Sequence, residues 1–243
     1  MTSIIILTYN QSKFTKMCIE SIYANTHDPY EIIVVDNGSR DETPVWLAEQ
    51  VRAEHIQCAI LNDSNRGVAA GWNQGIKMAD AKTDFYAILN NDVIVSEGWL
   101  SRLISCAGNA RDRGVVGPVT NYSSGPQAMQ TVNGYTLDTF QLFARDWAKA
   151  HDKERLFCSR LVGFCMLIKA EIVRKVVLFD ERFGRGNFED DDYCRRVEKA
   201  GYRNTIAVDC FIHHFGSVSW EPGALGAQLE KNTKIYNEKW GNA

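Results

Sequence analysis

The feature that most constrains the fold of this chain is a set of short apolar runs that contain no alternating polar residues. Ile4–Leu7 and Ile32–Val35 are the clearest of these runs. A strand with one wet face alternates apolar and polar side chains, so an unbroken apolar run indicates a strand that is covered on both faces, as in a parallel sheet. The first half is expected to hold five strands: Ser3–Tyr9, Glu31–Asp36, Gln57–Leu61, Phe85–Leu89 and Val115–Val119.

Segments with helical spacing separate these strands. Phe14, Met17, Cys18 and Ile22, for example, fall on one face of a helix. The alternation of strand and helix predicts right-handed crossovers and a doubly wound sheet. The predicted fold class is therefore α/β, with a mostly parallel central sheet flanked by helices and a Rossmann-like N-terminal half.

The second half of the chain is less regular. It predicts strands over Val162–Lys169 and Thr205–Ile212, a helix over Thr139–Ala150 and a loop over Asn121–Asn133. No linker or repeat divides the 243 residues, which favours a single domain. A last helix carries an apolar stripe that must be buried, and packing on the domain is expected, with a homodimer as the alternative to a monomer. The stripe consists of Leu225, Leu229, Tyr236 and Trp240.

Charge and cysteine content exclude several classes of protein. A net charge of −3 without a basic cluster gives no field that would attract nucleic acid. The seven cysteines are scattered and form no C-x-x-C pair, so reduced thiols and a cytoplasmic setting are expected. The apolar opening Ile4–Leu7 is too short for a signal peptide or a transmembrane segment. Any membrane contact would be peripheral, at the inner face.

Polar residues follow four consecutive predicted strands. In an open α/β sheet, ligands bind beyond the carboxyl ends of the strands, so these residues could line one crevice. The alternative is that they only form turns. The third group continues into a helix start with little side-chain bulk, Gly67–Gly75, which suits either an approaching phosphate or close helix–sheet packing. The four groups are Thr8-Tyr9-Asn10, Asp36–Ser39, Asn62–Gly67 and Asn90-Asn91-Asp92.

The acidic run Glu189–Asp192 is the strongest local signal. Acidic residues stabilise the first turn of a helix, yet four adjacent carboxylates exceed what that needs, and their repulsion should raise at least one pKa. Such groups are candidates for proton transfer. Helix geometry turns Glu189 and Asp190 toward the buried face and Asp191 nearly opposite, toward solvent.

A histidine pair, His213-His214, closes the strand-like run Thr205–Ile212. Beside an acidic strand end such as Asp92, a histidine would complete a metal site with nitrogen and oxygen ligands. Neighbouring residues of a strand point to opposite faces, so either His213 or His214 could serve.

Together these residues resemble the family 2 glycosyltransferases, which have the nucleotide-sugar-binding fold called GT-A. The resemblance runs from Ser3 to about Ser219, and its parts occur in the family's order. The parts are Thr8-Tyr9-Asn10 after a strand, Val34–Ser39, Asn65-x-Gly67 with Asn73, Leu89–Asp92, Gly163-Phe164, Phe179-Asp180-Glu181, Glu189-Asp190-x-Asp192 and His213.

The resemblance implies a role for each of these groups. Asp36 would meet the base or ribose of the nucleoside, which Thr8, Tyr9 and Asn10 would also hold. The diphosphate pocket would be lined by Asn65, Gly67 and Asn73. Asn90-Asn91-Asp92 stands at the family's D-x-D position with Asn90 in place of the first Asp, so that Asp92 is the acidic ligand and His213 a further partner of Mn²⁺ or Mg²⁺.

The implied activity is inverting transfer of a sugar from a UDP- or dTDP-linked donor to a hydroxyl of a glycan, a lipid-linked glycan or a protein, in the synthesis of surface polysaccharide or glycoconjugates. Asp190, with Glu189 and Asp191 beside it, matches the general base. Residues 1–119 would then form the nucleotide-sugar half and residues 120–243 the acceptor and catalytic-base half.

Three alternatives remain at this stage. A hydrolase could use the paired carboxylates but would need no nucleotide pocket. A carbohydrate-binding protein could use its six Trp and nine Tyr as stacking platforms. A nucleotidyltransferase would need a glycine- and lysine-rich loop after the first strand, and Thr8–Lys16 lacks one.

Overall fold

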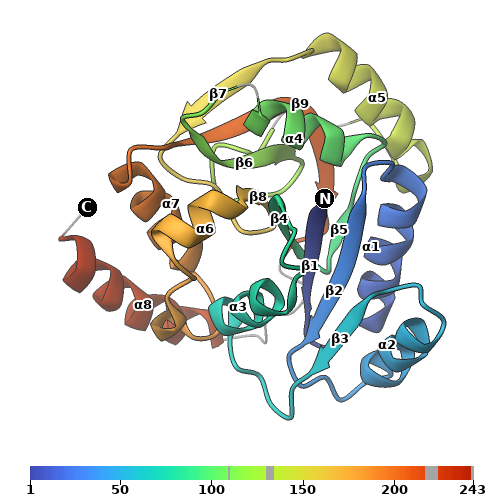
Figure 1. The fold of residues 1–243 in the computed structure, drawn as a ribbon, viewed down its shortest axis with the longest axis horizontal. Coiled ribbons are helices and arrows are strands. Elements are labelled where there is room, and N and C mark those ends of the chain that lie inside the picture. Colours follow the sequence, from blue (N-terminus) through green and yellow to red (C-terminus); the bar gives the residue numbers. More distant parts are fainter. Residues whose placement is uncertain (109, 130–133, 217–223, 242–243) are drawn as a thin grey trace.

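A computed structural model describes residues 1–108, 110–129, 134–216 and 224–241, apart from the side chains of 224 and 225 (Figure 1). Within these ranges the strands are β1 (Thr2–Thr8), β2 (Tyr30–Asp36), β3 (Cys58–Leu61), β4 (Phe85–Asn90), β5 (Val93–Ile94), β6 (Arg113–Thr120), β7 (Arg155–Cys158), β8 (Cys165–Lys169) and β9 (Arg203–His214). The α-helices are α1 (Ser12–Asn25), α2 (Thr43–Arg52), α3 (Val68–Met78), α4 (Trp99–Gly108), α5 (Phe140–Ala150), α6 (Ala170–Val176), α7 (Glu189–Lys199) and α8 (Ala224–Trp240).

The described strands form one sheet in the order β3-β2-β1-β4-β8-β6-β9-β5, with β7 paired to β9. β1 to β4 are parallel to one another, as expected for a Rossmann-like half. β8 lies antiparallel between β4 and β6, and β9 runs parallel to β6. The short strands β5 and β7 run antiparallel to β9. The predicted α/β class with a mostly parallel sheet is confirmed, and this sheet joins the two halves of the chain.

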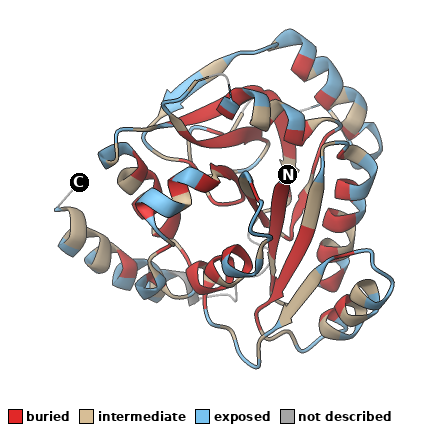
Figure 2. Ribbon diagram, in the orientation of Figure 1, coloured by how far each residue is buried: buried red, intermediate tan, exposed pale blue. Residues whose placement is uncertain are grey.

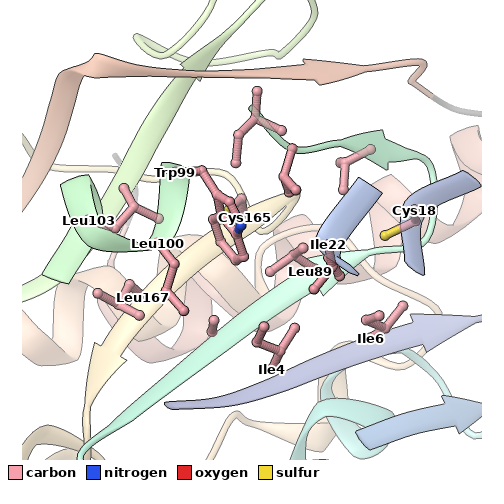
Figure 3. Close-up of a cluster of buried hydrophobic side chains, with 14 of the residues drawn as sticks. Ile4, Ile6, Cys18, Ile22, Leu89, Trp99, Leu100, Leu103, Cys165 and Leu167 are labelled. Carbon is pink, nitrogen blue, oxygen red and sulfur yellow. The ribbon is translucent and has the colours of Figure 1, made fainter. Parts of the chain in front are cut away.

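Burial on both faces of the sheet explains the unbroken apolar runs. Ile4 and Ile6 of β1 belong to a core that also holds residues of α1, α2 and α4, whereas Ile5 belongs to a second core with residues of α3, α5, α6 and α7. Figure 3 shows the first core, where Trp99 and Leu103 lie over the strands. Figure 2 shows the central strands as buried and the outward sides of the helices as exposed.

The small residues of α3 bring that helix close to the sheet. A Cβ on Gly71 would lie 2.3 Å from Leu7 Cδ1, and one on Gly75 would lie 2.3 Å from Ile5 Cγ2. Such distances leave no room for a larger residue. The sequence left open whether the small residues of this stretch admit a phosphate or allow close helix–sheet packing. For Gly71 and Gly75 the structure supports close packing.

The last helix packs on the domain mainly through polar contacts. Asn232 of α8 is fully buried and donates hydrogen bonds of 2.8 Å to the carbonyls of Phe183, Gly186 and Asn187. Leu229 stays 43% exposed, so the predicted stripe is not uniformly covered, and the side chain of Leu225 lies outside the described residues.

All seven cysteines are free in the structure. Among the described helices, none is long and apolar enough to cross a membrane. The predicted loop Asn121–Asn133 is described as far as Met129, and residues 130–133 lie outside the described part.

Candidate active site

A cavity of about 710 Å³ lies at the carboxyl ends of β1 and β4 and extends to the start of α7. Its position is the one expected for ligands of an open α/β sheet. It collects residues from both halves of the chain. The sequence-predicted residues that line it are Thr8, Tyr9, Asn65, Asn90, Asn91, Asp92, Glu189, Asp190 and Asp191.

Neutral side chains that bond to one another form the wall at the end of β1. Asn91 is buried and donates to the hydroxyls of Thr8, at 3.2 Å, and Thr15, at 3.0 Å. The two hydroxyls are themselves 2.7 Å apart. Because these bonds join β1, α1 and the end of β4, they hold this wall in one geometry.

The loop before α3 is held in a similar way. Asn65 Oδ1 accepts from the backbone N–H of Gly67 at 2.9 Å and from Asn37 Nδ2 at 3.1 Å. Gly67 has φ +92° and does not line the cavity, and a Cβ there would lie 2.1 Å from the carbonyl oxygen of Gly184. Gly67 is therefore required by the backbone conformation and by this close approach.

Asn10, Asp36 and Asn73 were predicted to contact the nucleotide, but none of them lines the cavity. The carboxylate of Asp36 accepts from the backbone N–H and the hydroxyl of Ser39, and Ser39 in turn accepts from the N–H of Asn10 at 2.6 Å. Burial raises the pKa of Asp36, and these hydrogen bonds oppose that rise. The structure thus shows Asp36 and Asn10 supporting the loop after β2.

Asn73 connects α3 to a distant segment of the chain. Its Nδ2 donates to the carbonyl of Phe179 and to Glu181 Oε1, both at 2.9 Å, and its Oδ1 accepts from the N–H of Phe179 at 2.9 Å. Because both ends of the amide are engaged in these contacts, the predicted diphosphate contact does not fit its placement.

Asp92 and a histidine lie together in the cavity, but the histidine is His214. His214 Nε2 is 3.3 Å from Asp92 Oδ1, and both side chains are buried. The predicted partner, His213, does not line the cavity, and its Nδ1 is 2.7 Å from the hydroxyl of Tyr135. The two histidines point to opposite faces of β9, which is why sequence alone left the choice open.

The Asp92–His214 pair fits a divalent cation. His214 Nδ1 lies 2.8 Å from the carbonyl of Tyr122, so in a neutral ring Nδ1 donates and Nε2 carries its lone pair toward Asp92. Neither His214 Nε2 nor Asp92 Oδ1 has a hydrogen-bond partner among the described residues. In these ranges no cluster of three or more His, Cys, Asp or Glu is arranged to hold a metal.

Carboxylates crowd the part of the cavity at the start of α7. Asp190 is 7% exposed, and its two oxygens accept from the N–H groups of Gly163 and Asp191, each at 2.9 Å. Burial raises the pKa of Asp190, and it raises that of Glu189 further, with the charge of Asp190 adding to the rise. These groups therefore bind protons more readily than exposed carboxylates do.

Helix geometry predicts that Asp191 points toward solvent, and this prediction is wrong. Asp191 lines the cavity and lies 2.7 Å from Arg160 Nε. Burial and then the charge of Asp190 raise its pKa to about 7. The helix begins only at Glu189, after Phe188 in a left-handed conformation, so ideal helix phase does not apply to the first turn.

Arg160, Arg185 and Trp72 are among the residues that line the cavity but were not predicted from the sequence. Arg160 and Arg185 lie outside every motif considered, and a single arginine carries no recognisable pattern. Trp72 is a core residue by burial, and a Cβ on Gly163 would lie 2.3 Å from its ring, so its presence at the cavity depends on that glycine.

Comparison with known proteins agrees with this geometry. The family model described as Glycosyl transferase family 2 matches residues 3–177. Over 96% of its length the chain is 26% identical to the N-acetylglucosaminyl-diphospho-decaprenol L-rhamnosyltransferase of Mycobacterium tuberculosis (strain CDC 1551 / Oshkosh), of which it covers 82%. EpsH of Bacillus subtilis (strain 168) is 26% identical over 67% of this chain, which covers 44% of EpsH.

A solved structure has the same fold. GalNAc-T7, in a crystal structure with UDP, GalNAc and Mn²⁺, superposes on 97% of this chain with a TM-score of 0.74 and 14% identity. The chain covers 48% of that protein, so it spans about half the length of GalNAc-T7 and of EpsH. With the family model matched over most of its length, the chain belongs to glycosyl transferase family 2 and has the GT-A fold.

Proposed function

We propose that this chain is an inverting, divalent-metal-dependent glycosyltransferase that uses a nucleotide diphosphate-sugar donor. One observation carries the proposal. A single cavity holds both Asp92 and His214, whose facing atoms have no hydrogen-bond partner among the described residues, and a buried carboxylate, Asp190, at the start of α7. Transfer by one displacement needs two such groups, because the leaving diphosphate and the attacking hydroxyl stand on opposite sides of the anomeric carbon.

Asp190 is the proposed general base. Its backbone contacts with Gly163 and Asp191 fix the carboxylate at the cavity wall. As the acceptor oxygen attacks the anomeric carbon, Asp190 takes the hydroxyl proton, and the bond from that carbon to the diphosphate oxygen breaks. A pKa raised by burial makes this carboxylate a stronger base than an exposed aspartate.

Asp92 and His214 are the proposed protein ligands of Mn²⁺ or Mg²⁺. When bound, the cation would neutralise charge that develops on the leaving diphosphate. The protein's own contribution is the fixed His214 tautomer and a neutral wall of Thr8 and Asn91, held from behind by Thr15, that adds no repelling charge.

The donor nucleotide is proposed to be UDP or dTDP, bound along the ends of β1 and β4. For the acceptor, the Mycobacterium tuberculosis relative suggests a lipid-linked saccharide diphosphate, since its name describes L-rhamnosyl transfer to such a molecule. A glycan or a protein acceptor remains the alternative, and monomer and homodimer are both compatible with this proposal.

Substitution of Asp190 by Asn tests the proposal. Asn keeps the size of the side chain but removes the proton acceptor, so transfer should fall by about 10²–10⁴-fold. Donor binding measured by calorimetry should remain, because the Asn oxygen can still accept one of the hydrogen bonds that Asp190 receives from the N–H groups of Gly163 and Asp191. The matched control is Asp191→Asn, which should lose far less activity. Near-normal turnover of Asp190→Asn would contradict the mechanism.

A further inference from the structure

Arg160 lies where three separate segments of the chain meet. It belongs to the segment between β7 and β8, and its Nε is 2.7 Å from Asp191 Oδ1 at the start of α7. Its Nη2 donates to the hydroxyl of Ser124, in the loop after β6, at 2.9 Å. The Asp191 side chain is 17% exposed, so water screens this ion pair less than it would a surface pair.

The positive charges around the four acidic residues Glu189–Asp192 are unevenly distributed. Asp192 alone has two cations, Arg196 at 2.9 Å and Lys239 at 2.7 Å. In the described part of the chain, Arg160 is the only cation that forms an ion pair with any of the other three carboxylates, and it does so through Asp191. The charge balance of Glu189, Asp190 and Asp191 therefore depends on this guanidinium.

We propose that Arg160 is a positioning residue for the general base: it ties the start of α7 to the Ser124 loop and supplies the positive charge that keeps Asp190 ionised. This inference rests on the proposed function. It also gives Asp191 a role other than proton transfer, namely to hold Arg160 at the cavity wall.

The inference has a consequence for the pH dependence of transfer. The ionisable groups facing Asp190 are Glu189, Asp191 and Cys194 on α7 and Arg160 across from it, with Arg185 at the rim. Arg160 lowers the pKa of Asp190, whereas the charge of Asp190 raises that of Asp191. Loss of Arg160 should therefore raise the pKa of Asp190.

The experiment compares kcat/KM against pH for the wild type, Arg160→Met, Asp191→Asn and the double variant. Arg160→Met should move the acidic limb upward by about one pH unit, with about tenfold lower activity on that limb and recovery at higher pH. Asp191→Asn should leave the limb close to its wild-type position, because Asp191 is already protonated at these pH values and Asn keeps an oxygen toward Arg160. The double variant should therefore follow the profile of Arg160→Met.

The matched control is Arg203→Met, which breaks an exposed pair with Asp112 and should leave the profile unchanged. A merely structural role for Arg160 predicts equal loss at every pH, and this outcome would overturn the inference. If Arg160→Met does not fold, Arg160→Gln is measured in its place, and an unmoved acidic limb in that variant would overturn the inference as well. A fully active Asp190→Asn would instead refute the underlying mechanism.

Discussion

The two ends of the cavity are built on different principles. At the strand ends of the N-terminal half, neutral amides and hydroxyls bond to one another, as Asn91, Thr8 and Thr15 do. At the start of α7, three carboxylates are crowded against a single guanidinium. The first end is fixed by neutral hydrogen bonds, whereas the second holds charges whose protonation depends on their neighbours.

This difference fits the demands of the proposed reaction. A wall that receives a diphosphate must not repel it, so neutral groups and one acidic metal ligand, Asp92, suit the donor end. A base must exchange a proton near neutral pH, so crowding and burial suit the other end.

The largest effect expected at the donor end is loss of the cation. Asp92→Asn removes the anionic ligand and should lower transfer by about 10²–10³-fold, while chelator should abolish transfer by the wild type until Mn²⁺ or Mg²⁺ is returned. His214→Ala should also lose the response to metal, whereas His213→Ala should keep it. Assays across a metal titration measure this response.

Asp84→Asn is the control for Asp92→Asn. Asp84 flanks the other end of β4, where it binds the N-terminal amine on the surface, and its substitution should leave metal-dependent transfer unchanged. Undiminished transfer in metal-free solution would refute a cation at Asp92 and His214.

A smaller effect is expected at Asn73, which connects α3 to Phe179 and Glu181. Asn73→Ala leaves buried backbone groups unpaired and should lower the free energy of unfolding by about 1–3 kcal/mol, measured by urea denaturation. Donor affinity of the folded variant should not change. Asn65→Ala, in a residue that does line the cavity, should weaken donor binding. If Asn73→Ala weakens donor binding equally, the structural role given to Asn73 is wrong.

The fold could be predicted from sequence because its signal is periodic. Ile4, Ile5 and Ile6 are buried alternately in two cores, and a run that is apolar at every position has no other simple explanation. The positions of residues after the strands were also predicted, since carboxyl ends of parallel strands share one edge.

The orientation of single side chains could not be predicted. Asp36 and Asn73 stand in the expected motifs, yet hydrogen bonds to Ser39 and Phe179 direct their polar atoms away from the cavity. His213 and His214 differ only in the face of β9 on which they lie, and a bulge-like register shift after Pro118 helps set that face. Such choices depend on tertiary contacts that leave no local pattern.

The last predicted effect concerns stability at the start of α7. Burial and the charge of Asp190 raise the pKa of Asp191 from 3.8 to about 7. Below about pH 4 the Asp191 carboxyl is protonated in both the folded and the unfolded protein. Between about pH 4 and about pH 7 the folded protein keeps this proton, whereas the unfolded chain has released it. The stabilisation linked to this proton is therefore complete at low pH and is lost as the pH rises through 7. Asp191→Asn is uncharged throughout, so its stability relative to the wild type should rise by about 1 kcal/mol for each pH unit between about pH 4.5 and 7 in urea denaturation. Asp112→Asn, at an exposed pair, is the control and should show no such trend. A constant difference between Asp191→Asn and wild type over this range would mean that Asp191 is ionised in the folded protein throughout, and the contrast between the two ends of the cavity would then rest on Asp190 and Glu189 alone.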